Sequence, residues 1–274
     1  MSVLTEDTII QEILPHLQTY NHGRKLPLRK LIGIVQLIFY RLKTGCQWRE
    51  LPIKQYIDDD SYRWQSVYHH FNKWCKDGSW RHTWIVLLKS NLDALDLSSA
   101  QLDGSQVLTK RGGQAVGYQG RKSGKTSNML YISDNQGILL AASHPEKGNH
   151  HDTFDIEKHF HELMDTLDQV GIATDGLFLN ADAGFDHKKL RQLCDQRKIN
   201  PNFCLNPRNG AVTDREEYFD PLLYKHRIVI EHAFAWLDAF KALLIRFETS
   251  ARNWFSMNLL GFIAIFARKR LKLF

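Results

Sequence analysis

YKHRIVIEHAFAWLDAFKALLIRFE, residues 224 to 248, is a mostly apolar stretch that carries a few polar residues at helical spacing. At about 100° per residue, Tyr224, Arg227, Glu231 and Asp238 fall within roughly a 60° sector of one helical face. Because an unpaired charge inside a protein is costly, such a polar face needs partners or a metal. The pattern therefore predicts one long, largely buried helix that aims a polar stripe at either an ion-pair network or a reaction site.

An ion pair between Arg227 and Glu231 would by itself explain the stripe equally well as a structural feature. Two carboxylates upstream favour a reaction site. Asp103 lies inside the strand-like run 100–108, and Asp182 closes the apolar run 177–181. An acid has low strand propensity and little structural use there, although Asp103 could also be a turn residue before a glycine.

Composition limits the class of protein. The chain has 274 residues, which suits one large domain or two ordinary ones, a formal net charge of +6 and a pI near 9.1. The basic balance favours an acidic partner, with nucleic acid the first candidate. Four scattered cysteines without a C-x-x-C pair argue against a zinc ribbon or a disulfide framework and suit a reducing cytoplasm. The N-terminus lacks a signal-peptide core, and the apolar run 254–267 is too short for a bilayer, so we expect a buried helix and no membrane partner.

The first part of the chain is expected to be helical. Helical spacing predicts helices over residues 28–42, 62–76 and 80–92, with the acidic run 58–61 as the cap of the second. Aromatic and basic residues alternate within 62–76. That alternation fits a DNA-reading helix and a core helix with a solvated face equally well.

From about residue 98 the pattern changes to alternating strands and helices. Strands are expected at 100–108, 128–133, 138–143, 177–181 and 202–205. Helices are expected from Asp152 or Thr153 to about 170, and over 187–197 with Asp186 as the cap. The order predicts an α/β sheet with crossover connections. Residues 110–125 are rich in glycine and basic residues and predict a flexible loop or hairpin.

Three acids form the candidate catalytic set: Asp103, Asp182 and Glu231. Carboxylate oxygens suit Mg²⁺ or Mn²⁺, and two such ions about 3.5–4 Å apart activate a water or 3′-hydroxyl and stabilise the leaving oxygen of a phosphodiester. Asp182 is preferred to Asp186 because ligands of α/β sheets gather at strand ends. Glu248 is a weaker substitute for Glu231, since it lies at the expected helix end.

Basic residues close to the Asp103 strand are candidates for DNA contact, because a charged loop beside a reaction site can hold a phosphate backbone. They are Lys110, Arg111, Arg121, Lys122 and Lys125. The neighbouring cluster His150-His151-Asp152 does not suit zinc, because adjacent histidines point apart. For His151 we expect contact with the substrate strand, and for Asp152 either such contact or a helix cap.

Four blocks resemble one known family. They are LIGIVQLIFYRLKTGCQWRELP with YRWQSVYHHFNKWCKDGSW, then QLDGSQV, LNADAGFDHKKLR, and the Y-x2-R-x3-E pattern that begins at Tyr224. Together they make the chain similar to bacterial insertion-sequence transposases of the DDE type, in the insertion sequence 5 group. The resemblance implies an α/β fold with an RNase H-like mixed sheet flanked by helices, residues 96–274, after a small all-α DNA-binding domain, residues 1–95.

The resemblance also implies a function. Asp103, Asp182 and Glu231 would bind two catalytic Mg²⁺ or Mn²⁺ ions, and Tyr224 and Arg227 would position DNA, the arginine through a phosphate. The expected reaction is cleavage and strand transfer at the terminal inverted repeats of an element. The expected partners are double-stranded repeat and target DNA and a second copy of the chain, in the bacterial cytoplasm at the nucleoid.

Two positions depart from the family pattern. Asp238 stands where the signature has lysine, so we expect Lys241, one turn further along, to substitute in DNA contact. Phe185 replaces a usual tyrosine and should have a mild effect. The first departure keeps two alternatives open: a transposase-derived DNA-binding protein without catalytic activity, and an RNase H-like nuclease.

Overall fold

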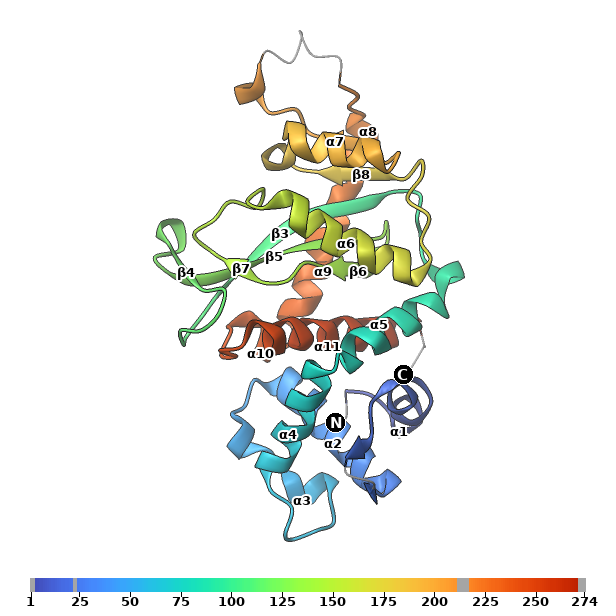
Figure 1. Ribbon diagram of the computed structural model, residues 1–274, viewed down its shortest axis with the longest axis vertical. Coiled ribbons are helices and arrows are strands. Elements are labelled where there is room, and N and C mark those ends of the chain that lie inside the picture. Colours follow the sequence, from blue (N-terminus) through green and yellow to red (C-terminus); the bar gives the residue numbers. More distant parts are fainter. Residues whose placement is uncertain (1–2, 22–23, 211–216, 271–274) are drawn as a thin grey trace. The chain divides into compact units, whose positions relative to one another are not determined.

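The computed structural model describes residues 3–21, 24–210 and 217–270 (Figure 1). The chain forms two compact units, one made of residues 1–87 with 236–274 and the other of residues 88–235. The first unit therefore combines both ends of the chain. Helix α9 (Ile228–Asp238) begins in the second unit and ends in the first.

The first unit is almost entirely helical. Its longer helices are α2 (Leu28–Thr44), α4 (Trp64–Lys76), α5 (Ser79–Lys89) and α11 (Ala251–Arg270), and its short elements are α1 (Glu6–Thr8), β1 (Tyr20–Asn21), β2 (Arg24–Lys25), α3 (Ile53–Tyr56) and α10 (Lys241–Leu244). Residues 253–267 of α11 are buried, and Trp84 of α5 packs edge-on against Phe262 and Phe266. The predicted helical N-terminal region and the buried helix over 254–267 are confirmed.

Local sequence explains one helix end in this unit and fails to predict another. Helix α2 ends at Gly45, whose φ of 66° is left-handed and suits a glycine C-cap. The predicted cap of the next long helix by residues 58–61 is wrong, because α4 begins only after its N-cap Arg63. Asp59 instead pairs with Lys30 at 2.8 Å and accepts from Ser61. A cationic partner from another helix thus outcompetes the local cap.

The second unit is built on a mixed sheet. Its strands are β3 (Ala100–Leu108), β4 (Gly117–Gln119), β5 (Gly124–Ser133), β6 (Leu139–Ala142), β7 (Glu146–Lys147), β8 (Phe178–Ala181) and β9 (Asn200–Phe203). The strand order is β4-β5-β3-β8-β9, with β6 and β7 also pairing with β5. β3, β8 and β9 are parallel, whereas the pairings of β5 are antiparallel. The predicted α/β class with a mixed sheet is confirmed, and residues 110–125 form a hairpin that includes β4.

Helices cover the two faces of this sheet. Helices α6 (Ile156–Val170) and α7 (Lys188–Gln196) pack together, with α6 in front of the sheet in Figure 1. Helix α8 (Pro221–Tyr224), a 3₁₀ turn (Lys225–Arg227) and the first part of α9 lie on the opposite face. The helix that carries Glu231 therefore runs across the back of the sheet.

The prediction of one continuous helix over residues 224–248 is wrong. Helix α9 ends at Asp238, the backbone of Phe240 is extended, and α10 begins at Lys241. The apolar content of this stretch is the physical reason. Phe240, which lies in the break, and Leu243 are 1% and 3% exposed, so the chain stays in the apolar core where the helix is interrupted.

Candidate active site

Asp103 and Asp182 occupy matching positions on neighbouring strands. The parallel pairing of β3 with β8 aligns Gln101 with Asn180. Continuing this register by two residues places Asp103 beside Asp182, which follows directly after β8. Adjacent strands lie about 4.8 Å apart. Two acids that are distant along the chain are thus close enough for the charge of Asp182 to raise the pKa of the Asp103 carboxyl.

A ladder of buried amide side chains crosses three parallel strands just below these acids. Gln101, Asn180 and Asn202 are each 0% exposed. Asn180 donates to Gln101 Oε1 at 2.9 Å, and Asn202 donates to Asn180 Oδ1 at 2.7 Å. Gln101 and Asn180 each precede a candidate catalytic aspartate by two residues, so they share its strand face.

The same ladder anchors the segment that leads into α9. Asn202 donates to the carbonyl of Asp220 at 3.0 Å and accepts from its backbone N–H at 2.7 Å. Asn180 donates to the carbonyl of Leu223 at 3.3 Å. This ladder was not predicted from the sequence. Its only signal was an amide two residues before each aspartate.

Arg227 joins two of the three candidate acids. Its Nη1 donates to Asp103 Oδ2 and its Nη2 to Glu231 Oε1, each at 2.8 Å. The side chains of Asp103 and Arg227 are 17% and 19% exposed, and that of Glu231 is 49% exposed. The ring of Tyr224 lies 6.0 Å from the guanidinium carbon. The helical stripe therefore meets the sheet at Asp103.

Burial and neighbouring charges shift the pKa values of Asp103 and Arg227. Burial raises the pKa of the Asp103 carboxyl to about 6, although Arg227 and the backbone N–H of Gly104 pull it down, and the charge of Asp182 raises it further. Burial alone would lower the pKa of Arg227, but the nearby charges of Asp103, Tyr224, Glu231 and Asp182 raise it overall. All three acids thus act on one guanidinium.

The carboxylates of Asp103, Asp182 and Glu231 are ligands of the type that binds hard divalent cations. In this structure they are not arranged around a common cation position. Among the residues that the structure describes, no group of three or more His, Cys, Asp and Glu side chains is arranged to hold a metal ion. The guanidinium of Arg227 stands between Asp103 and Glu231 instead. Carboxylate oxygens fit Mg²⁺ and Mn²⁺, so these acids suit such ions once the guanidinium moves.

Asp186 serves a different purpose from the one predicted. The N-cap of α7 is His187, so the predicted capping by Asp186 is wrong. The Asp186 carboxylate is 1% exposed and accepts from Arg191 Nε at 2.9 Å and from the backbone N–H of Asn206 at 2.7 Å. Its oxygens therefore tie α7 to the loop after β9.

Asp152 also does not cap a helix, because the N-cap of α6 is Asp155. Asp152 accepts from Asn128 Nδ2 at 2.6 Å. It lies so close to Gly104 that a Cβ there would be 2.6 Å from its Oδ1. Any larger residue at that position of β3 would have to displace the Asp152 carboxylate from its bond to Asn128.

The remaining predicted DNA-contacting residues are spread over two regions. The basic side chains of the hairpin are all exposed, and Lys122 donates to the carbonyl of Gln106. His151 is exposed beside the start of α6. Lys241 belongs to the first unit, where it begins α10 and packs against Gly45. The exposed basic residues of the hairpin are Lys110, Arg111, Arg121, Lys122 and Lys125.

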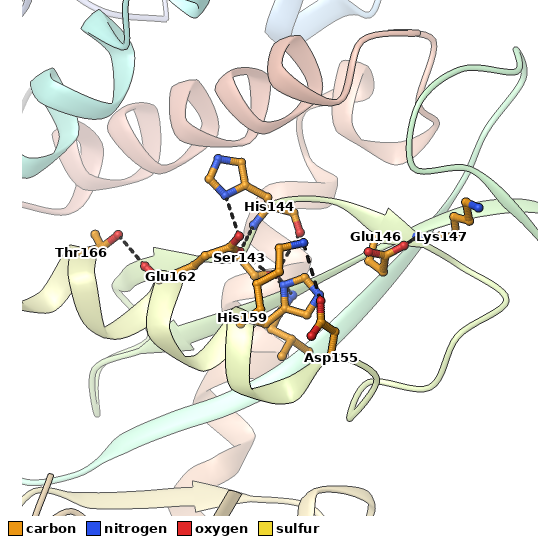
Figure 2. Close-up of polar contacts among 10 residues, drawn as sticks. Ser143, His144, Glu146, Lys147, Asp155, His159, Glu162 and Thr166 are labelled. Carbon is orange, nitrogen blue, oxygen red and sulfur yellow. Dashed lines mark hydrogen bonds and ion pairs between the residues drawn. The ribbon is translucent and has the colours of Figure 1, made fainter. Parts of the chain in front are cut away.

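A second polar cluster, not foreseen from the sequence, lies on the α6 side of the sheet (Figure 2). Glu162 accepts from the backbone N–H of His144 at 2.9 Å and contacts the rings of His144 and His159 at 3.2 and 3.3 Å. Burial alone would raise the pKa of Glu162, but the bonds from the two histidines lower it overall. This cluster joins β6 to α6.

Comparison with family models identifies the class of protein. The family model "Transposase DDE domain" matches residues 94–266, well over half of the chain, and the chain belongs to that family. A second model, "Putative transposase of IS4/5 family (DUF4096)", matches residues 7–84. The protein is therefore a DNA transposase of the insertion-sequence type, as the four sequence blocks predicted.

Other comparisons add little. The chain is similar to the solved structure titled "Crystal structure of the Mos1 mariner paired end complex with Mn", with 12% identity, a TM-score of 0.32, and coverage of 90% of this chain and 80% of that one. For "Crystal structure of a pre-cleavage Mos1 transpososome" the values are 12%, 0.29, 88% and 78%. At these TM-scores neither likeness carries an argument. A search of curated proteins finds no match. Within the described residues, every helix is too short or too polar to cross a membrane.

Proposed function

We propose that this transposase cuts and joins DNA at the terminal inverted repeats of its insertion sequence, with Asp103, Asp182 and Glu231 as catalytic residues that hold two Mg²⁺ or Mn²⁺ ions. The observation that carries the proposal is the convergence of these acids. Gln101 and Asn180, two residues before Asp103 and Asp182, are paired on neighbouring strands, and one guanidinium joins Asp103 to Glu231. When bound, the ions supply an activated water or 3′-hydroxyl and stabilise the leaving oxygen.

The protein groups around the acids would bind and orient the DNA. Arg227 and Tyr224 lie at the acids and would position the strand next to the cut, the arginine through a phosphate. The exposed basic hairpin would hold the backbone farther along, together with His151 and Lys241. In this proposal residues 1–95 help to bind the repeats, and residues 96–274 carry out the reaction on repeat and target DNA.

The protein would act as a homodimer that brings two element ends together, in the bacterial cytoplasm at the nucleoid. The basic balance of the chain supports a nucleic-acid partner, because a net charge of +6 attracts a polyanion at long range. Symmetric pairing of two similar DNA ends suits two identical protein copies.

A nicking assay on DNA that carries the element's end tests the proposal. We expect Mg²⁺-dependent nicking at the repeat boundary by the natural protein and none by Asp182→Ala. Binding without nicking would favour a catalytically idle DNA-binding protein, to which the acid at Asp238 in place of a lysine points. Nicking that ignores the repeat sequence would favour a nuclease.

A further inference from the structure

Arg227 occupies the space between two acids that are proposed to share a metal ion. Two different nitrogens of its guanidinium donate to two different carboxylates, Asp103 Oδ2 and Glu231 Oε1, each at 2.8 Å. A divalent ion held by these two acids would compete with the guanidinium for their carboxylate oxygens. Guanidinium and metal therefore compete for one position.

The helix that carries Arg227 is held in place independently of this ion pair. Asn202 and Asn180 bind the backbone of Asp220 and Leu223, four to seven residues before Arg227. These anchoring amides are fully buried. The Arg227 side chain is 19% exposed and its partner Glu231 is 49% exposed, so the guanidinium has a route towards solvent. Displacement requires a rotation of the side chain, not a movement of the helix.

Charge balance favours such an exchange. Three ionised acids and one guanidinium leave two negative charges at the site. With two divalent ions the same groups would carry two positive charges, so the guanidinium would be repelled and a DNA phosphate would be attracted. Arginine suits both partners, because its planar fork matches carboxylate and phosphate oxygens.

On the basis of the proposed function, we propose that Arg227 is the resident cation of the metal-free site, that a divalent ion displaces it, and that the freed guanidinium then binds a DNA phosphate. Arg227 would thus be a positioning residue with two successive partners. It keeps Asp103 and Glu231 facing each other before metal enters, and it becomes available for DNA only afterwards.

Mn²⁺ binding to the full chain without DNA, measured by calorimetry, is the first test. Removing the competitor in Arg227→Gln should tighten Mn²⁺ binding by about 5- to 150-fold, the usual range for coupled binding events. Arg227→Lys keeps the charge but lacks the two-pronged fork, so it should also bind Mn²⁺ more tightly than the natural protein. If Arg227→Lys matches the natural protein while Arg227→Gln alone binds more tightly, charge explains the effect and the displacement is refuted. Unchanged binding in both variants refutes it as well.

Modification by phenylglyoxal, an arginine-selective reagent, read out by mass spectrometry, is the second test. Saturating Mn²⁺ should speed modification of Arg227 several-fold. Arg197, which binds Asp168 through two bonds of 2.9 and 2.7 Å, provides the internal control and should not change. An unchanged rate at Arg227 with Mn²⁺ bound would overturn the proposal.

Asp182→Asn separates this proposal from the proposed function. If Mn²⁺ binds equally well to the natural protein and to Asp182→Asn, the proposed metal site itself fails. If Mn²⁺ binding needs Asp182 and Arg227 still reacts at the same rate, the metal site stands and only the displacement fails.

Discussion

Two arginines of the α/β unit bind carboxylates in opposite ways. Arg191 directs both its contacts to a single acid, Asp186, with a hydrogen bond from Nε and an ion pair from Nη2, and the side chains are only 11% and 1% exposed. Arg227 divides its donors between Asp103 and Glu231, and the second of these acids is half exposed. In the first cluster, buried groups of the protein bind the carboxylate of Asp186. The second holds together two acids that would otherwise repel each other.

The difference separates an ion pair that stabilises the fold from one that can be exchanged. Asp186 also accepts from the backbone of Asn206, so its removal leaves both a charge and an N–H without a partner. Breaking such a buried pair is far more costly than breaking an exposed one. The partners of Arg227 are acids whose oxygens also suit a cation from solution.

The largest expected effect is on DNA cleavage, at the acids around Arg227. Asp182→Asn should lower DNA cleavage by at least about 10³-fold, because a neutral amide no longer binds a metal as a carboxylate does. Stability should change by less than about 0.5 kcal/mol, since the amide oxygen still accepts from the N–H of Gly184. Nicking rates and urea unfolding of the same preparation measure both quantities. Cleavage within tenfold of the natural protein would remove Asp182 from the catalytic set.

Asp186→Ala tests whether the ion pair of Arg191 stabilises the fold. It should cost about 3–5 kcal/mol in the free energy of unfolding, because Arg191 is left buried without its carboxylate. Urea unfolding measures the loss, and Asp168→Ala, which removes an exposed partner of Arg197, is the matched control with about 1 kcal/mol or less. Equal losses in the two variants would show that burial does not distinguish these pairs.

Glu162 is an intermediate case, because its carboxylate is bound by histidines and is 20% exposed. Its pKa is lowered in the folded protein, so the folded state binds fewer protons than the unfolded state and Glu162 stabilises the fold above about pH 4.5. Glu162→Gln should therefore cost about 1–3 kcal/mol near pH 7. The difference should shrink as the pH falls below 4.5, because the carboxyl then becomes protonated in the unfolded state while the folded state still holds it ionised. A cost that does not vary with pH would contradict this assignment.

Local sequence predicts best the elements in which apolar and polar residues recur with a single clear period. The strand Ala100–Leu108 was predicted with its observed bounds, and the i, i+4 relation of Arg227 to Glu231 follows from helical spacing. Capping was predicted poorly, because Asp59 pairs with Lys30 of another helix and Asp186 binds Arg191 and the backbone N–H of Asn206 in place of the first turn of α7. The partners Lys30 and Asn206 lie 29 and 20 residues away along the chain, so local sequence does not indicate them.

Two features of the site depended on register between strands. Alignment of β3, β8 and β9 forms the ladder of Gln101, Asn180 and Asn202. The position of β3 in the sheet also brings Asp103 to the polar stripe of the helix. No spacing along the chain encodes that alignment. Likewise, the packing of α11 with the N-terminal helices in one compact unit joins the two ends of the chain, which composition alone does not indicate.

The smallest expected effect concerns the departure at Asp238. Helix α9 ends there and Lys241 begins a new helix, so Lys241 does not continue the stripe of Arg227 and Glu231 as a helical neighbour. If Lys241 nevertheless contacts DNA, Lys241→Ala should lower cleavage by roughly fivefold, the worth of an exposed charge contact of about 1 kcal/mol, while Asp238→Ala should not lower it. Nicking assays at two salt concentrations measure this, because a phosphate contact weakens as salt rises. Equal, unaffected cleavage in both variants would show that Lys241 does not compensate for the missing lysine, and the contact to DNA would then rest on Arg227 and the hairpin.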